Sequence, residues 1–353
     1  MTPMPNDITK EQLIAAMDRQ LRIQGRLYMY LAKETIGRFA QEGEMTVRLG
    51  LRALGRWRGL EMRAAHHALG RPINMQTLAQ CWDNASTFIV KDALEANGRY
   101  RPHDVRFDVP YCPASEVWKE GGFHQWGHVY CDEFHQACAS TYHPDGNVVI
   151  PINMMKGDDH CHFQWIMPPE AEDLGLGKPT AFGEKLARDY KPQSELEDAW
   201  MSLRRSNRLY GGWFISLATA ALERHGAEGR AAVTAALETW GADRGRRLRK
   251  AHLDEKITPS AANFIRYHDL PAREVWRTRI VEEHGARTVI EISESPQDDA
   301  LADYDAGALG DLWYEASYPA MVGAYLPGST VRWLALRGKG GDTNRLEITT
   351  ARP

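Results

Sequence analysis

The sequence predicts an α+β protein in which a helical segment followed by a small antiparallel sheet occurs twice. Three observations predict this fold: capping-box patterns that begin helices, a later change to the two-residue period of strands, and the return of both features in the second half of the chain. Helices that precede an antiparallel sheet are typical of the α+β class. A chain of 353 residues, 43% hydrophobic and 25% charged, is long enough for two domains with a sizeable core.

Each half begins with a helix. Thr9 and Gln12, and again Ser194 and Glu197, have the spacing of a capping box, in which side chains satisfy the first free backbone N–H groups of a helix. Apolar residues at helical spacing continue to about residue 67 in the first half and 252 in the second. We therefore expect a largely helical segment at the start of each half.

The period then changes to that of strands. Residues 105–109 and 288–292 alternate between apolar and polar side chains, as a strand with one buried face does. After a further helix and a turn, each half ends in two strands. These final strands are expected at residues 147–154 and 161–167 in the first half, and at 330–336 and 345–350 in the second.

The recurrence extends to individual residues. At an offset of 186, eight of the twenty positions in 47–66 are identical to those in 233–252, where composition alone gives about one or two matches. At an offset of 183 a second block aligns without a gap and pairs Gly157 with Gly340. We predict a tandem duplication that forms a pseudo-two-fold dimer within one chain. Its parts are residues 1–170, residues 190–353 and a linker rich in Pro and Gly at 168–192.

The two halves differ in the residues that can support chemistry. All five cysteines lie in the first half, and seven of the thirteen histidines lie between residues 103 and 162. At the 183 offset the second half has other residue types at these positions: Cys112 aligns with Ser295, and Cys131 with Tyr314. We therefore predict an active first half and a structural second half. The candidate site residues are Cys112, His124, His128, Cys131, Asp132, His135, His160, Cys161 and His162.

One chemistry open to these residues is metal binding. A zinc-like divalent ion bound by histidine and cysteine lowers the pKa of a bound water and so supplies a nucleophile. On a strand, however, His160 and His162 point to one face and Cys161 to the other, so the three cannot all reach one ion without distortion. The candidate metal ligands are His128, His135, His160, Cys161 and His162.

The other chemistry is a cysteine thiolate activated by a nearby histidine. Cys131, Cys161 or Cys112 would be the nucleophile, His124 lies in the same cluster, and Asp132 would orient the histidine or act as the base. Ordinary histidines near the surface remain the alternative for the whole cluster.

The end of the first half resembles a known family. Cys131-Asp132 on a helix, followed by Gly157-Asp-Asp-His-Cys-His-Phe163, is similar to the signature of the L-2-amino-thiazoline-4-carboxylate hydrolase-like family, which closes with Gly-Asp-x-x-Cys-x-Phe. The resemblance implies hydrolytic opening of a small ring containing sulfur and nitrogen, with Asp132 in the acidic position. The same ending is similar to 4-vinyl-reductase-type domains, which dimerise and bind small molecules. Those domains hold zinc partly through a cysteine where this sequence has Asn153.

The sequence therefore favours a hydrolase that acts on a small cyclic C–N or C–S compound, through metal-activated water or a cysteine nucleophile. A small-molecule binding or sensory module without catalysis is the alternative from another class, and a lyase or isomerase would use the same groups. We expect a small-molecule substrate as the partner and leave a homodimer open. A divalent metal is the cofactor to test, and no nucleotide cofactor is indicated, since residues 338–341 lack the GxxxxGK[ST] pattern.

Composition excludes other classes of partner. A net charge of −4 gives no electrostatic reason to bind nucleic acid, and no apolar run approaches the roughly 18 residues that cross a membrane. The start of the sequence has neither the basic nor the apolar region of a signal peptide, and five cysteines are too few for a disulfide framework. We therefore expect a cytoplasmic protein.

Overall fold

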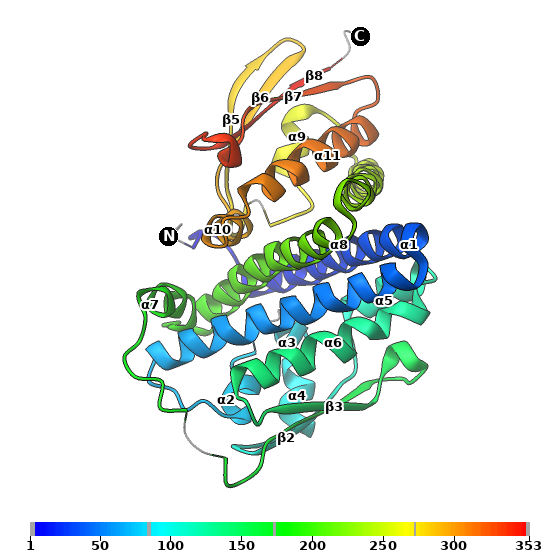
Figure 1. The fold of residues 1–353 in the computed structure, drawn as a ribbon. Coiled ribbons are helices and arrows are strands. Elements are labelled where there is room, and N and C mark those ends of the chain that lie inside the picture. The colour runs from blue at the N-terminus through cyan, green and yellow to red at the C-terminus, as the bar shows by residue number, and fades with distance from the viewer. Residues whose placement is uncertain (1–3, 83–85, 172–173, 272, 351–353) are drawn as a thin grey trace.

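The computed structural model describes residues 4–82, 86–171, 174–271 and 273–350. The α+β prediction is confirmed, because two four-stranded antiparallel sheets accompany a larger set of helices. Figure 1 shows the sheets at opposite ends of the molecule, with the long helices α1 (Lys10–Ala68) and α8 (Glu195–Asp254) between them. No helix in the described ranges combines the length and the apolar character that a membrane crossing requires.

Side-chain caps begin these two helices at the predicted residues, with a full capping box in α1 and the serine cap alone in α8. The Thr9 side chain accepts a hydrogen bond from the backbone of Gln12, whose own side chain accepts one from the Thr9 backbone. In α8 the Ser194 hydroxyl accepts from the backbone N–H of Glu197 at 3.1 Å, and the Glu197 carboxylate accepts from the backbone N–H of Gln193. Both helices therefore begin where the sequence predicts.

Each long helix bends sharply into a hairpin. The backbone is non-helical at Ala40 (φ 49°, ψ −123°) and at Gly226 (φ 56°, ψ −127°). Beyond the bends, a Cβ added at Gly43 or at Gly229 would lie less than 3.0 Å from a carbonyl oxygen of the opposite arm. Only a residue without a side chain permits the two arms to approach so closely.

The first sheet has the strand order β1-β2-β4-β3. The strands predicted at 105–109 and 161–167 are confirmed, whereas the strand predicted at 147–154 ends at Ile152 because Asn153 turns the chain into a short 3₁₀ helix. Gly157 (φ 106°) ends that turn in the left-handed region. The elements of this half are α2 (Met75–Gln80), α3 (Ser86–Ile89), α4 (Lys91–Asn97), β1 (Arg99–Arg101), β2 (Asp104–Val109), α5 (Pro113–Glu120), α6 (His124–Tyr142), β3 (Asn147–Ile152), η1 (Met154–Lys156) and β4 (Cys161–Ile166).

The second sheet has the corresponding order β5-β6-β8-β7. Every element from α10 to β8 begins and ends 183 residues after its counterpart in the series from α5 to β4. The predicted duplication requires this correspondence; a common origin and a pseudo-two-fold relation remain predictions. The elements here are α7 (Ala181–Ala187) and η2 (Arg188–Tyr190) in the linker, then α9 (Ala261–Arg266), β5 (Arg277–His284), β6 (Arg287–Glu294), α10 (Pro296–Asp303), α11 (Gly307–Tyr325), β7 (Thr330–Ala335), η3 (Arg337–Lys339) and β8 (Asn344–Thr349).

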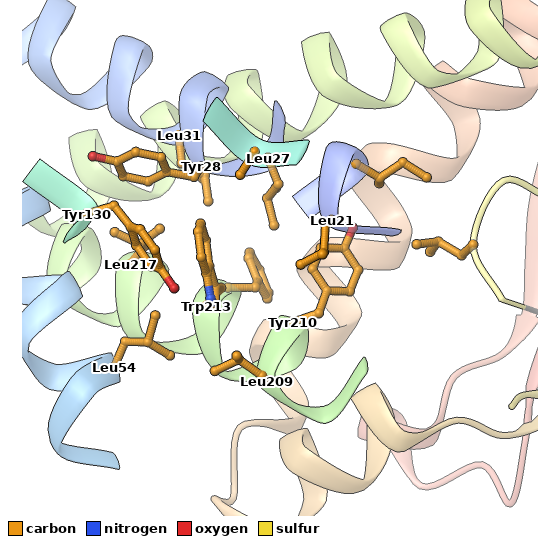
Figure 2. Close-up of a cluster of buried hydrophobic side chains, with 14 of the residues drawn as sticks. Leu21, Leu27, Tyr28, Leu31, Leu54, Tyr130, Leu209, Tyr210, Trp213 and Leu217 are labelled. Carbon is orange, nitrogen blue, oxygen red and sulfur yellow. The ribbon is translucent and has the colours of Figure 1, made fainter. Parts of the chain in front are cut away.

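One continuous hydrophobic core runs through both halves. At its centre the Trp213 ring of α8 lies edge-on to Tyr28 of α1, with centroids 5.7 Å apart, and 4.4 Å from Tyr130 of α6. Figure 2 shows these side chains together with leucines from both long helices. The Trp240 indole of α8 also donates to the Ile23 carbonyl of α1 at 3.3 Å. Each half therefore completes the core of the other.

Candidate functional site

A small cavity of about 70 Å³ lies in the first half, where α5 and α6 meet the inner face of the β1–β4 sheet. Aromatic rings form much of its wall, among them Phe107, Trp118 and Phe163. Three of the predicted cysteines, Cys112, Cys131 and Cys161, also line it, together with His135. The structure therefore brings four of the nine candidate residues to one space.

The three thiols come from three different elements. Cys112 is the N-cap residue of α5, Cys131 lies on α6, and Cys161 begins β4 with its side chain on the buried face. Burial raises the pKa of Cys112, raises that of Cys161 to about 11, and raises that of Cys131 well above its usual value with help from the neighbouring thiols. The thiols are therefore protonated at neutral pH, and a nucleophilic role requires a base.

His135 lines the cavity and is the candidate for that base. Its Nδ1 lies 3.0 Å from the backbone carbonyl of Cys131, one turn earlier on α6, and burial lowers the pKa of the imidazole to about 4. A neutral ring next to a carbonyl oxygen must carry its proton on Nδ1 in order to donate to that oxygen. The lone pair is therefore on Nε2, which can accept a proton.

Three other side chains of the wall hold unused hydrogen-bond donors. Tyr130 Oη, Asn153 Nδ2 and Trp165 Nε1 are buried and have no hydrogen-bond partner among the residues that the structure describes. The Asn153 amide is held in place because its Oδ1 accepts from the backbone of Met155 at 2.8 Å. Leaving a buried polar group unpaired costs about 1–3 kcal/mol each, and a ligand with acceptor atoms would satisfy all three groups.

Sequence reasoning did not select these three donors. The sequence could have indicated Trp165, because it lies four residues after Cys161 and therefore on the same face of the predicted strand. Tyr130 and Asn153 had no comparable signal, since it is the tertiary structure that leaves their polar atoms without partners.

Asp132 and His128 lie outside the cavity, on a neighbouring stripe of α6. The Asp132 carboxylate lies 2.9 Å from Nδ1 of His128 and 3.0 Å from Nζ of Lys156. The second half has the same lysine–acid pair in Lys339 and Glu315. This shared ion pair fits a role in the common frame of the two halves.

Of the remaining candidate histidines, His160 and His162 lie on the outer side of the sheet or at its edge. His162 Nδ1 is 2.6 Å from the Asp108 carboxylate, and His160 Nε2 is 3.8 Å from the same group. Asp159 contacts His160 as well and raises its pKa. Cys161 faces the cavity from the opposite side of the strand, so the predicted alternation is confirmed. His124 is exposed at the first turn of α6.

The five predicted metal ligands therefore lie at three places. His135 and Cys161 are at the cavity, His128 is beside Asp132, and His160 and His162 are beside Asp108. Among the residues that the structure describes, no group of three or more His, Cys, Asp or Glu is arranged to hold a metal ion. As the structure places them, these side chains do not come together as a zinc-like centre, and metal binding stays a prediction.

A larger pocket of about 470 Å³ adjoins the cavity, because Trp82 and Phe107 line both. Its wall includes the cationic side chains of Arg71, Lys91 and Arg205. This outer pocket lies where the first half meets η2 and the start of α8, and the rings of Trp82 and Phe107 separate it from the cavity.

The fold and the cavity define an α+β protein whose first half encloses a small buried cavity, with a larger pocket beside it. Residues 20–165 match the model of a protein family described as L-2-amino-thiazoline-4-carboxylic acid hydrolase. The resemblance noted in the sequence is thereby confirmed for this segment, and every residue that lines the cavity falls inside it. No curated protein and no solved structure matches the chain.

Proposed function

We propose that the protein is a hydrolase that opens a small ring with C–N and C–S bonds and a carboxylate, of the kind named in the family description. The main observation in support is that a neutral histidine, with its lone pair on Nε2, shares a buried cavity with three thiols. A thiol and a base in one water-poor space are the parts that nucleophilic catalysis by cysteine requires.

In the proposed reaction, Nε2 of His135 takes the proton of the Cys131 thiol, which is one helical turn away. The sulfur bonds to the ring carbon between nitrogen and sulfur, the C–N bond breaks, and the departing nitrogen receives the proton from His135. Water then attacks the same carbon, the bond to the Cys131 sulfur breaks, and the proton of the water returns to the thiol.

The unused donors in the wall suit such a substrate. Tyr130, Asn153 and Trp165 can donate to carboxylate oxygens or ring heteroatoms, which relieves the cost of leaving these groups unpaired. The wall of the outer pocket has three cations, Arg71, Lys91 and Arg205, against two carboxylates, Glu95 and Asp198, and the remaining positive charge would favour an anionic substrate. A binding module without catalysis accounts for the donors, but it gives no role to the base.

The direct test is incubation of the protein, purified without chelators, with 2-amino-thiazoline-4-carboxylate. Ring opening is followed by mass spectrometry as the addition of one water. We expect turnover by the unmodified protein and a loss of about 100-fold or more in His135→Asn, since proton transfer contributes about 10²–10⁴-fold. Tyr318→Phe is the matched control, because Tyr318 is the counterpart of His135 in the second half.

The same experiment separates the alternatives. Turnover that survives removal of metal by a chelator supports the thiol route, whereas turnover in proportion to bound metal would favour metal-activated water. Binding of the compound without turnover would support the binding module. Equal activity in His135→Asn and Tyr318→Phe would contradict the proposed site.

A further inference from the structure

A second pocket, of about 380 Å³, lies between the two halves. The first part of α1, the last part of α8 and the segment that follows α9 enclose it. Seven of its sixteen lining residues are arginines and three are carboxylates. Three more carboxylates bind these arginines from outside the wall, which still leaves the positive charges in excess.

The deepest arginine is not fully satisfied. Arg244 forms a two-point pair with Asp269 at 2.8 and 2.6 Å, and its side chain is 1% exposed. Its third nitrogen, Nη1, is buried, and no described residue forms a hydrogen bond with it. The same holds, within the described ranges, for Nε2 of His252, another wall residue. A guanidinium nitrogen in this state favours an additional acceptor.

The neighbouring Arg26 is also incompletely paired with carboxylates. Arg26 is 8% exposed, and its guanidinium lies 3.4 Å from the carboxylate of Glu120 and 3.8 Å from that of Asp243. Burial lowers the pKa of Arg26, and the positive charge of Arg247 lowers it further. The nearby carboxylates therefore do not fully compensate the buried Arg26 charge.

The rim adds exposed cations. Arg247 is about half exposed and is paired with Asp243 at 2.9 Å. Arg266 and Arg273 are exposed and form no ion pair within the part of the chain that the structure describes. Arginine matches the geometry of carboxylate and phosphate groups with two parallel hydrogen bonds. A volume of this size is within the range of pockets that bind small molecules.

We infer that this pocket binds a small anion with two or more phosphate or carboxylate groups, at the junction of the two halves. The anion would lie between the rim arginines and the buried edge of Arg244. This site is separate from the cavity, and the inference does not depend on the proposed hydrolysis.

The test is isothermal titration calorimetry with pyrophosphate and citrate as probes, on the full chain at low ionic strength. The double variant Arg247→Gln/Arg266→Gln should lower the affinity for the probe by about tenfold or more, since each hydrogen bond to a charged group contributes substantially to binding. Arg246→Gln is the matched control, because Arg246 is exposed on the same helix and does not line this pocket. Stronger binding of pyrophosphate would assign a phosphate ligand, and stronger binding of citrate a carboxylate ligand.

Two results would overturn the inference. Equal weakening by Arg246→Gln would show attraction to general surface charge, and no measurable binding of either probe would show that the pocket does not take such anions. The rim variants leave the Arg244–Asp269 pair in place, and circular dichroism checks that they remain folded.

Discussion

The space that forms the cavity in the first half is filled in the second. Tyr314 and Tyr318 stand where the first half has Cys131 and His135; both rings are buried, and their centroids are 5.4 Å apart. The Tyr314 hydroxyl donates to Asp298, which also accepts from Asn344, the counterpart of Cys161. One frame therefore surrounds a cavity with thiols in one half and a hydrogen-bonded aromatic cluster in the other.

The frame itself is closely shared. His66 is buried and bonded to the Tyr142 hydroxyl at 2.8 Å, and His252 is bonded to Tyr325 in the same way at 2.7 Å. The comparison teaches that side-chain volume and chemistry separate the halves, while the helix contacts beneath them are alike. Chemistry should therefore respond to changes in one half only, and stability to changes in either.

The largest effect is expected when the first half is made to resemble the second. Cys131→Tyr should fill the cavity and Cys131→Ser should remove the thiol, and each should lower kcat/KM on the ring compound by about 100-fold or more. Tyr314→Cys should leave kcat/KM unchanged. Near-normal activity in both Cys131 variants would place the nucleophile at Cys112 or Cys161, whose serine variants are assayed in parallel.

A smaller effect, on the stability of the protein and equal in the two halves, is expected where each long helix packs against the helix beneath its sheet. A Cβ at Gly59 would lie less than 3.0 Å from the Cys138 carbonyl, and one at Gly245 equally close to that of Met321. Gly59→Ala and Gly245→Ala should each lower the free energy of unfolding by about 1–3 kcal/mol through overpacking. Urea denaturation measures both changes. A clear difference between them would contradict the prediction that the helix contacts of the two halves are alike.

The shared histidines predict loss of stability in acid. Burial lowers the pKa of His66 to about 3, whereas in the unfolded chain it is about 6.5. Below pH 6.5 His66 becomes protonated in the unfolded chain but stays neutral in the native protein. The free energy of unfolding therefore falls, by about 2 kcal/mol at pH 5. His66→Gln should reduce the difference in urea midpoint between pH 7.5 and pH 5.

His252 sharpens this test. Burial lowers its pKa as well, so His252→Gln should change the acid dependence in the same direction. An unchanged dependence in both variants would assign the loss of stability to other groups.

The smallest effect concerns the bends. Ala40 has the backbone angles that Gly226 has in the other hairpin, in a region that costs a residue with a Cβ about 1–3 kcal/mol. Ala40→Gly should therefore raise the free energy of unfolding by about 1 kcal/mol, and Gly226→Ala should lower it. Thermal melting compares the two, and destabilisation by Ala40→Gly would show that this position is not strained.

The sequence was most informative where local rules decide. Capping at Thr9 and the opposite facing of Cys161 and His162 follow from helix and strand geometry alone, and both are present. The strands β1 and β5 were missed, because the pairing that makes them strands depends on partners in other segments. The bend at Ala40 had no signal, since alanine is a helix former.

The candidate site was predicted in part for a similar reason. The spacing of four residues that joins Cys131 to His135 also joins His128 to Asp132, and a sequence does not show which stripe faces inward. On α6 the two pairs are roughly 60° apart around the helix axis, and only the first reaches the cavity.

The contact between Trp213 and Tyr130 links the site to the order of protein synthesis. Tyr130 belongs to the cavity wall, yet the ring that supports it comes from α8. At roughly 5–20 residues per second, α8 follows the last strand of the first half after an interval on the order of ten seconds. During that time the part of the apolar surface of α1 that packs on α8 has no partner, so we expect the nascent first half to depend on chaperones until α8 emerges.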